Sequence, residues 1–253
     1  MFDNPTFVPL AWFAGSLIAI WLSARWIHRH LFLVGAIITG NDGAAAWLFA
    51  VILFPGVFVH ETSHWLCAKV LGIRTEGMSL IPRLRKTGEL ELGSTRLSAK
   101  VDPIRESIIG AAPLIVGFVI LYLLANHVFG VAEATSAVSS WNIKQVGELL
   151  AQGYQTNDFY LWAYLSFSVG NTMIPSASDR RAWPIIVAIG AVLLLTAYAL
   201  QAPSSYIVSA IESTTSLVQN MTAVLILAVT INVMVLTIFL IVEAVWIFRG
   251  GTF

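Results

Sequence analysis

The sequence predicts an all-α polytopic membrane protein with about six transmembrane helices and a small amount of β structure. Of its 253 residues, 57% are hydrophobic and 11% are charged, whereas a soluble domain has about 45–50% and about 25%. Apolar runs of about 20 residues, long enough to cross a bilayer, recur along most of the chain. We therefore expect one integral-membrane domain over residues 1–253. The net charge of zero gives no indication of a nucleic-acid partner.

The apolar runs define the predicted helices in order. Leu31–Ile38 is apolar but too short to cross as a helix, so an interfacial or re-entrant segment is open there. The first residues, Met1–Pro5, lack the basic region of a cleaved signal peptide, and we expect the first apolar run to be retained. The six candidate spans are Val8–Trp26, Ala44–Leu71, Ile104–Val128, Phe159–Ile174, Trp183–Leu200 and Ala223–Phe248.

Two loops between these runs differ in charge. Gly72–Pro103 is basic, and within it Glu89–Leu92 alternates polar and apolar residues, which predicts a strand in a small membrane-associated hairpin or sheet. Phe129–Asp158 is polar and mostly acidic. Basic loops favour the cytoplasmic side, so we expect the first loop inside and the second outside. Arg25 and Arg29 oppose this orientation, which leaves the topology of residues 1–43 open. The basic residues of the first loop are Arg74, Arg83, Arg85, Lys86, Arg96 and Lys100.

A metal-binding pattern lies inside the second apolar run, where Phe58–Trp65 has the sequence FVHETSHW. On a helix His60 and His64 share one face and can reach one zinc ion. Glu61, offset by about 100°, is then placed near the water of such a site as a general base. An acidic residue in mid-membrane costs about 2.5–3.5 kcal/mol, so such groups are functional or paired. The competing interpretation is a hydrogen-bonded polar cluster between helices.

A third ligand is needed, because a catalytic zinc ion has three protein ligands and one open position. The segment Asn171–Asp179 ends an apolar run and contains a proline, and irregular backbone in a membrane protein is tolerated where it lines a cavity. Asp179 is our candidate ligand, and Asn171 is a candidate hydrogen-bond donor to a substrate or oxyanion. The alternative for Asp179 is a helix cap or an ion pair with Arg180 or Arg181.

Other polar residues in the apolar runs have more than one possible role. The single cysteine, Cys67, excludes a multi-thiolate zinc site. It shares the face of the two histidines, where it could touch the metal, respond to oxidants or simply fill space. Glu243 and Asn232 lie on one face of the last run, which indicates a polar contact between helices or a substrate gate.

Three segments, in order, resemble the site-2 protease family of intramembrane zinc metalloproteases. HETSHWLCAKVLGIRTEGMSLIPR, residues 60–83, is similar to the family's H-E-x-G-H helix and the loop that follows. RESIIGAAPLIVG, residues 105–117, is similar to its Gly-Pro segment, and NTMIPSASD, residues 171–179, to its N-x-x-P-x-P-x-x-D-G motif. The departures are Ser63 and Ala112 at glycine positions, a single displaced proline at Pro175, and Arg180 in place of the last glycine.

The resemblance implies a three-helix metalloprotease core, at about residues 44–181, with residues 1–43 and 182–253 added to it. It implies zinc ligands at His60, His64 and Asp179, a catalytic Glu61, and an active site toward the cytoplasmic side of the membrane, which is the cell membrane if the organism is a prokaryote. Its substrates would be transmembrane proteins, surrounded by membrane lipid. By analogy, a substrate strand could pair with a sheet edge near Glu89–Leu92.

Three functions compete at this point. The first is an intramembrane zinc metalloendopeptidase, which the complete set His60, Glu61, His64 and Asp179 favours. The second is a non-proteolytic homologue that serves as a structural or binding subunit with partners in a membrane complex. The third, a metal transporter, fits less well, because the sequence contains neither a second polar cluster nor an inverted repeat.

Overall fold

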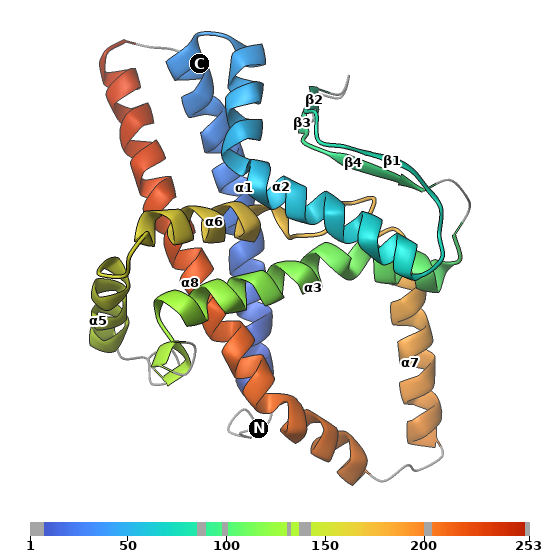
Figure 1. Cartoon of the computed structure of the whole chain (residues 1–253). Coiled ribbons are helices and arrows are strands. Elements are labelled where there is room, and N and C mark those ends of the chain that lie inside the picture. The colour runs from blue at the N-terminus through green and yellow to red at the C-terminus, as the bar shows by residue number, and fades with distance from the viewer. Residues whose placement is uncertain are drawn as a thin grey trace.

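The computed structural model describes residues 8–84, 90–97, 101–130, 133–136, 143–199 and 204–250. Glu89 of the predicted strand, Leu200 of a predicted span, and Arg85, Lys86 and Lys100 of the basic loop lie outside these residues. Helices dominate the described part of the chain (Figure 1). In chain order the elements are α1 (Val8–Thr39), α2 (Asp42–Val70), β1 (Thr75–Ser79), β2 (Arg83–Leu84), β3 (Leu90–Glu91), β4 (Ser94–Leu97), α3 (Pro103–Val128), α5 (Ile143–Tyr154), α6 (Phe159–Thr172), α7 (Trp183–Ala199) and α8 (Ser204–Phe248).

Four helices are long and apolar enough to cross a membrane: α1, α2, α3 and the Thr214–Phe248 part of α8. The prediction of an all-α membrane protein is thus confirmed, but six spans are not shown. The predicted spans at Phe159–Ile174 and Trp183–Leu200 correspond to helices of 14 and 17 residues. At 1.5 Å per residue α6 is about 21 Å long, short of a hydrocarbon core of about 30 Å.

Helix α1 differs from its prediction in length. The helix continues through Trp26 and Leu31–Ile38 to Thr39, a run of 32 residues. Its sequence contains no proline after Pro9, so the basic residues that interrupt the apolar run do not interrupt the helix. Leu31 and Val34 are buried. The segment left open by the sequence is therefore a continuation of α1.

Helix α2 changes direction part-way along its length, as Figure 1 shows, and it contains an internal proline, Pro55. A proline has no N–H to donate and breaks the hydrogen-bond ladder inside a helix. Ser168 of α6 compensates here: its Oγ accepts from the Gly56 N–H at 2.9 Å and donates to the Leu53 carbonyl at 3.1 Å. The bend, and with it the direction of the following turns of α2, is held by α6.

Gly56 permits this crossing of α2 and α6. A Cβ at this position would lie 2.2 Å from the Ser168 carbonyl oxygen and 2.2 Å from Thr172 Oγ1. Only a residue without a side chain lets the two backbones approach so closely. Helix α3 also contacts both α2 and α6, so the three helices pack together.

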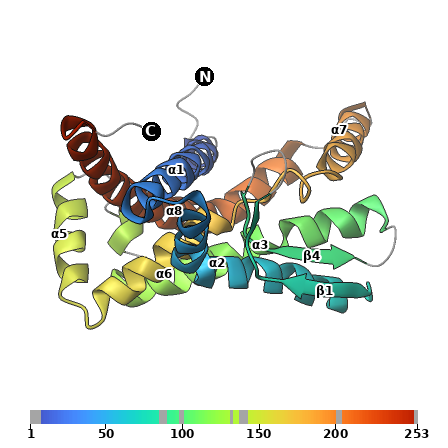
Figure 2. The same ribbon diagram turned by 90° about the horizontal axis from the view of Figure 1, so that it is seen from above.

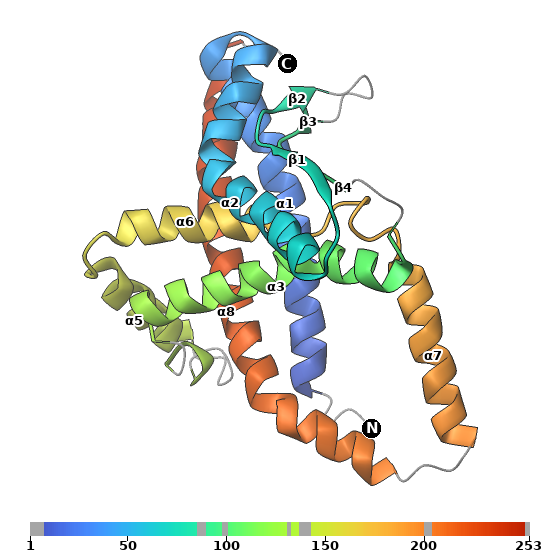
Figure 3. The ribbon, with the colours of Figure 1, turned by 45° about the vertical axis from the view of Figure 1, so that its right-hand side comes forward.

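Helix α3 begins at a strong N-terminal signal. Asp102 accepts a hydrogen bond from the Arg105 N–H at 3.0 Å, and Pro103 occupies the first helical position. The helix then runs beside the second half of α2 and crosswise to α1 and α8 (Figures 1 and 3). This places the second half of α2 between α3 and the strands.

The strands form two antiparallel pairs, β1 with β4 and β2 with β3. Leu84 pairs with Leu90 and Arg83 with Glu91, so the predicted strand at Glu89–Leu92 is confirmed for Leu90–Glu91. Met78 of β1 lies opposite Thr95 of β4. Both β1 and β4 contact α2, and Figure 2 shows them beside this helix. We call the pair β1 and β4 the β-ribbon.

Polar contacts join α1, α6 and α8. His30 Nδ1 lies 2.7 Å from Glu243 Oε1, and Asn232 donates to Ser23 Oγ at 3.0 Å. The expectation that Glu243 and Asn232 make contacts between helices is confirmed. Asn232 and Asn171 also exchange two hydrogen bonds, of 2.7 and 3.2 Å.

Candidate metal centre

Backbone carbonyls orient the two histidines of α2. His60 Nδ1 lies 2.6 Å from the Thr172 carbonyl oxygen, at the end of α6, and His64 Nδ1 lies 2.8 Å from the Ile109 carbonyl oxygen of α3. A carbonyl only accepts, so in each ring Nδ1 carries the hydrogen and donates it. Each Nε2 is thereby left with a lone pair, which is the tautomer that a metal ligand needs.

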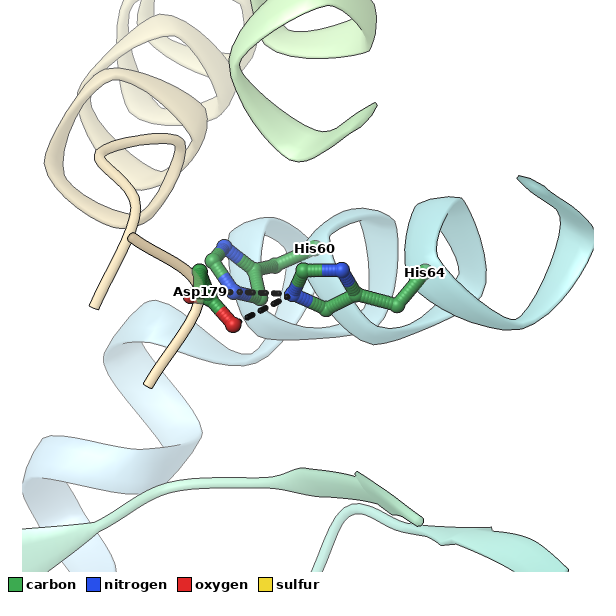
Figure 4. Close-up of side chains that lie close together, drawn as sticks. All are labelled: His60, His64 and Asp179. Atoms are coloured by element: carbon green, nitrogen blue, oxygen red, sulfur yellow. Dashed lines mark hydrogen bonds and ion pairs between the residues drawn. The ribbon is translucent and has the colours of Figure 1, made fainter. Parts of the chain in front are cut away.

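The two Nε2 atoms and the carboxylate of Asp179 converge on one point (Figure 4). The distances are 3.1 Å between the two Nε2 atoms, 3.3 Å from His64 Nε2 to Asp179 Oδ1 and 3.7 Å from His60 Nε2 to Asp179 Oδ2. In a tetrahedral zinc site with bonds of about 2.0–2.1 Å, two ligand atoms lie about 3.3–3.4 Å apart. The spacing and the chemistry of this donor set therefore fit a zinc ion.

Asp179 is held in place by its own segment and by α3. Its Oδ2 accepts from the Ser176 N–H at 2.7 Å. In the described residues the side chains nearest the Asp179 carboxylate are the two histidines, and Arg180 Nε turns to the Ser176 carbonyl instead. This favours the ligand interpretation over a pair with a neighbouring arginine.

Gly110 of α3 lets the backbone of Asp179 approach. A Cβ on Gly110 would lie 2.0 Å from the Asp179 carbonyl oxygen. Gly110 belongs to the Gly-Pro segment of the sequence. The residue before it, Ile109, accepts the hydrogen bond of His64. Helix α3 therefore contacts two of the three residues of the group, His64 and Asp179. The geometry of the centre thus depends on all three core helices.

Glu61 lies beside this group and is covered by the β-ribbon. Its side chain is buried, with 6% of its surface exposed. Thr95 Oγ1 donates to Glu61 Oε2 at 2.7 Å, and Gly93 lies against the same side chain. Sequence patterns give no signal for either contact, because Thr95 follows Glu61 by 34 residues.

The side chain of Asn171 makes its hydrogen bonds away from the three candidate ligands. Its amide donates to the Phe167 carbonyl at 2.7 Å and is paired with Asn232 of α8, and only 2% of the residue is exposed. A donor role toward a substrate has no support in this geometry. Cys67 is a half-buried free thiol and does not belong to the metal-binding group.

None of the family models matches this chain, and no match was found among curated proteins or solved structures. The class that the chain's own features define is a helical membrane protein with a group of two histidines and one aspartate able to hold a metal ion.

Proposed function

We propose that the protein is an intramembrane zinc metalloendopeptidase of the site-2 protease type, which hydrolyses peptide bonds in transmembrane segments of membrane proteins. The observation that supports this most is the convergence of His60 Nε2, His64 Nε2 and the Asp179 carboxylate, with Glu61 on the next residue of the same helix. A polar cluster that only joins helices has no need for two imidazoles with free Nε2 lone pairs directed at one carboxylate.

The roles of the residues follow from their chemistry. His60, His64 and Asp179 would hold the zinc ion and leave a fourth position open. A zinc ion at this position supplies Lewis acidity toward water and a peptide carbonyl. Glu61 takes a proton from the attacking water and later delivers it to the amine that leaves. Neutral imidazoles suit this arrangement because they add no charge of their own.

The location of the site supports a membrane substrate. His60 and His64 lie on α2, a helix apolar enough to cross a bilayer, so the reacting groups are at a depth where transmembrane segments can reach them. The basic loop that follows α2 favours the cytoplasmic side for this end of the helix. Substrates would be other transmembrane proteins, reached through surrounding lipid.

Metal analysis paired with a cleavage assay tests the proposal. The protein is purified in detergent beside the variants Glu61→Gln, His64→Ala and His127→Ala, and each is assayed with a single-span membrane substrate. We expect one zinc ion in the wild type and in Glu61→Gln, loss of zinc in His64→Ala, and no cleavage by either of these two variants.

His127→Ala is the matched control, because His127 lies near the end of α3, exposed to solvent or lipid and outside the metal-binding group. It should keep both zinc and cleavage. Zinc without cleavage by the wild type across a panel of single-span substrates would contradict the protease and favour a structural subunit built on the same fold. Absence of zinc would contradict the metal centre itself.

A further inference from the structure

Thr95 makes a short contact with the side chain that the proposed reaction uses as its base. Thr95 lies in β4, and its Oγ1 is 2.7 Å from Glu61 Oε2 and 3.2 Å from the Glu61 carbonyl oxygen. A hydroxyl has one hydrogen, so it donates to one of these oxygens at a time and can turn from one to the other. The contact joins the β-ribbon to α2 beside the metal ligands.

Gly93 closes the same side of the Glu61 carboxylate. A Cβ on Gly93 would lie 2.8 Å from Glu61 Cγ and 3.0 Å from Oε1. The glycine is not required by its backbone, because it is absent from the described glycines with positive φ. Gly93 is therefore needed for space, and any larger residue would push Glu61 away from its present position.

These two contacts restrict the conformations that the Glu61 side chain can adopt. A glutamate has three χ angles, and a base that samples several rotamers spends little time near the proton it must take. We propose that Thr95 is a positioning residue for Glu61, and that Gly93 and Thr95 together form the wall of the site that aims the Glu61 carboxylate. This inference depends on the proposed function, because it assumes that Glu61 is the base.

The second acceptor gives the hydroxyl a use throughout the proposed reaction. While Glu61 is a carboxylate, Thr95 donates to Oε2. After Glu61 has taken up the proton of water on its other oxygen, Thr95 can go on donating to Oε2 or turn to the Glu61 carbonyl, and the proton stays available for the amine. The side chain stays in place in both states. Serine could do the same, whereas valine, with the shape of threonine, could not.

The test compares four variants in the zinc-loaded, detergent-purified protein. Thr95→Val removes the hydroxyl and keeps the shape, Thr95→Ser keeps the hydroxyl, and Gly93→Ala displaces Glu61. Thr75→Val is the matched control, because Thr75 lies in the same β-ribbon, opposite Leu97 and away from Thr95. For each variant kcat, KM and zinc content are measured with a single-span substrate.

We expect Thr95→Val and Gly93→Ala to lower kcat by about 10–100-fold, the usual effect of removing a partner of a site residue. KM and the zinc content should stay near the wild-type values, since no ligand is touched. Thr95→Ser should recover most of kcat, and Thr75→Val should behave as the wild type. A role limited to folding of the β-ribbon would predict that Thr75→Val and Thr95→Val have similar effects.

A measurement without substrate tests the contact independently. The shift in Tm caused by Thr95→Val is determined in the wild type and in a Glu61→Ala background, and it should be smaller in the second because the partner is gone. Equal shifts would contradict the contact. Suppose that the wild type cleaves and Glu61→Gln does not. If Thr95→Val then has the same kcat as the wild type, the role of Thr95 is contradicted and the proposed function is not. If the wild type itself does not cleave, the proposed function fails, and the role of Thr95 in it fails as well.

Discussion

Gly110 lies where α3 passes the backbone of Asp179, and the fit there leaves no space for a side chain. The nearest atom to a Cβ on this residue would be the Asp179 carbonyl oxygen, at 2.0 Å. Since the Asp179 carboxylate lies 3.3 and 3.7 Å from the Nε2 atoms of His64 and His60, a displacement of its backbone moves a proposed metal ligand. A single methyl group at Gly110 should therefore be felt at the metal centre.

Gly110→Ala tests this effect, with Gly147→Ala as its control. Alanine is normally favoured over glycine inside a helix by about 1 kcal/mol. Gly147, in α5, has open space around its Cβ position, so Gly147→Ala should raise the free energy of unfolding by up to about 1 kcal/mol. Gly110→Ala should lower both this free energy and the affinity for zinc. Thermal unfolding and zinc titration in detergent measure the two quantities, and equal behaviour of both variants would contradict the close approach.

The three proposed ligands could be predicted from the sequence, but the atoms that orient them could not. The spacing of His60 and His64 on a helix places both on one face, and the proline-containing segment before Asp179 indicates irregular backbone in a cavity. Thr172 and Ile109 contribute only their carbonyl oxygens. A main-chain oxygen leaves no trace in residue identity, so these contacts depend on how α3 and α6 pack.

At the scale of the elements, α6 holds the other helices in place. It is too short to span the bilayer, yet Ser168 supports the bend of α2 and Thr172 orients His60. Its side chain Asn171 faces away from the metal ligands and binds Asn232 of α8. The sequence motif singled out Asn171 as a donor to substrate. In the structure its side chain instead joins α6 to α8.

We predict that Asn171→Ala and Asn232→Ala have similar effects. Each should lower the free energy of unfolding by about 1 kcal/mol, because hydrogen bonds between membrane helices contribute about 0.6–1.7 kcal/mol. The double variant should lose less than the sum of the two, since both changes remove the same pair. Denaturation in detergent gives these values, with Thr237→Ala, on the exposed side of α8, as the control.

The same variants separate the packing role of Asn171 from a role toward substrate. If Asn171 serves only in packing, Asn171→Ala and Asn232→Ala should change kcat to the same extent, because both remove the same contact between α6 and α8. A donor to substrate would instead make Asn171→Ala lower kcat strongly while Asn232→Ala left it near the wild-type value. That second result would restore the role that the sequence motif indicated.

Helix ends were predicted well where local signals mark them and poorly where only hydropathy was available. Asp102 and Pro103 mark the start of α3, and the predicted start at Ile104 differs by one residue. In α1, Arg25 and Arg29 end the apolar run but leave the helix intact, because charged residues do not break backbone hydrogen bonds. Of the four strands, only Leu90–Glu91 was predicted. Strands this short form because of the strand they pair with, and the sequence of one strand does not show its partner.

At the scale of the whole molecule, the four apolar helices do not share one direction. Helix α3 runs crosswise to α1 and α8 (Figures 1 and 3), so the four cannot all follow the bilayer normal. Arg25 and Arg29 are exposed within α1, at positions where hydrocarbon would make charge costly. After Glu106, helix α3 contains no Asp, Glu, Lys or Arg, and His127 lies in its last turn. We therefore expect α3 to cross the bilayer over its full length.

This expectation places the two ends of α3 on opposite sides of the membrane. Its 26 residues span about 39 Å, enough for a hydrocarbon core of about 30 Å with some tilt. Single cysteines replace Glu76 and Asp158, both exposed, in a Cys67→Ser background, and an impermeant maleimide is added to intact cells. Because basic loops favour the cytoplasm, Asp158→Cys should react at once and Glu76→Cys only after permeabilisation. Reaction of both in intact cells, or of neither before permeabilisation, would mean that α3 does not cross, and the metal centre would then lie at a different depth from the one a transmembrane substrate requires.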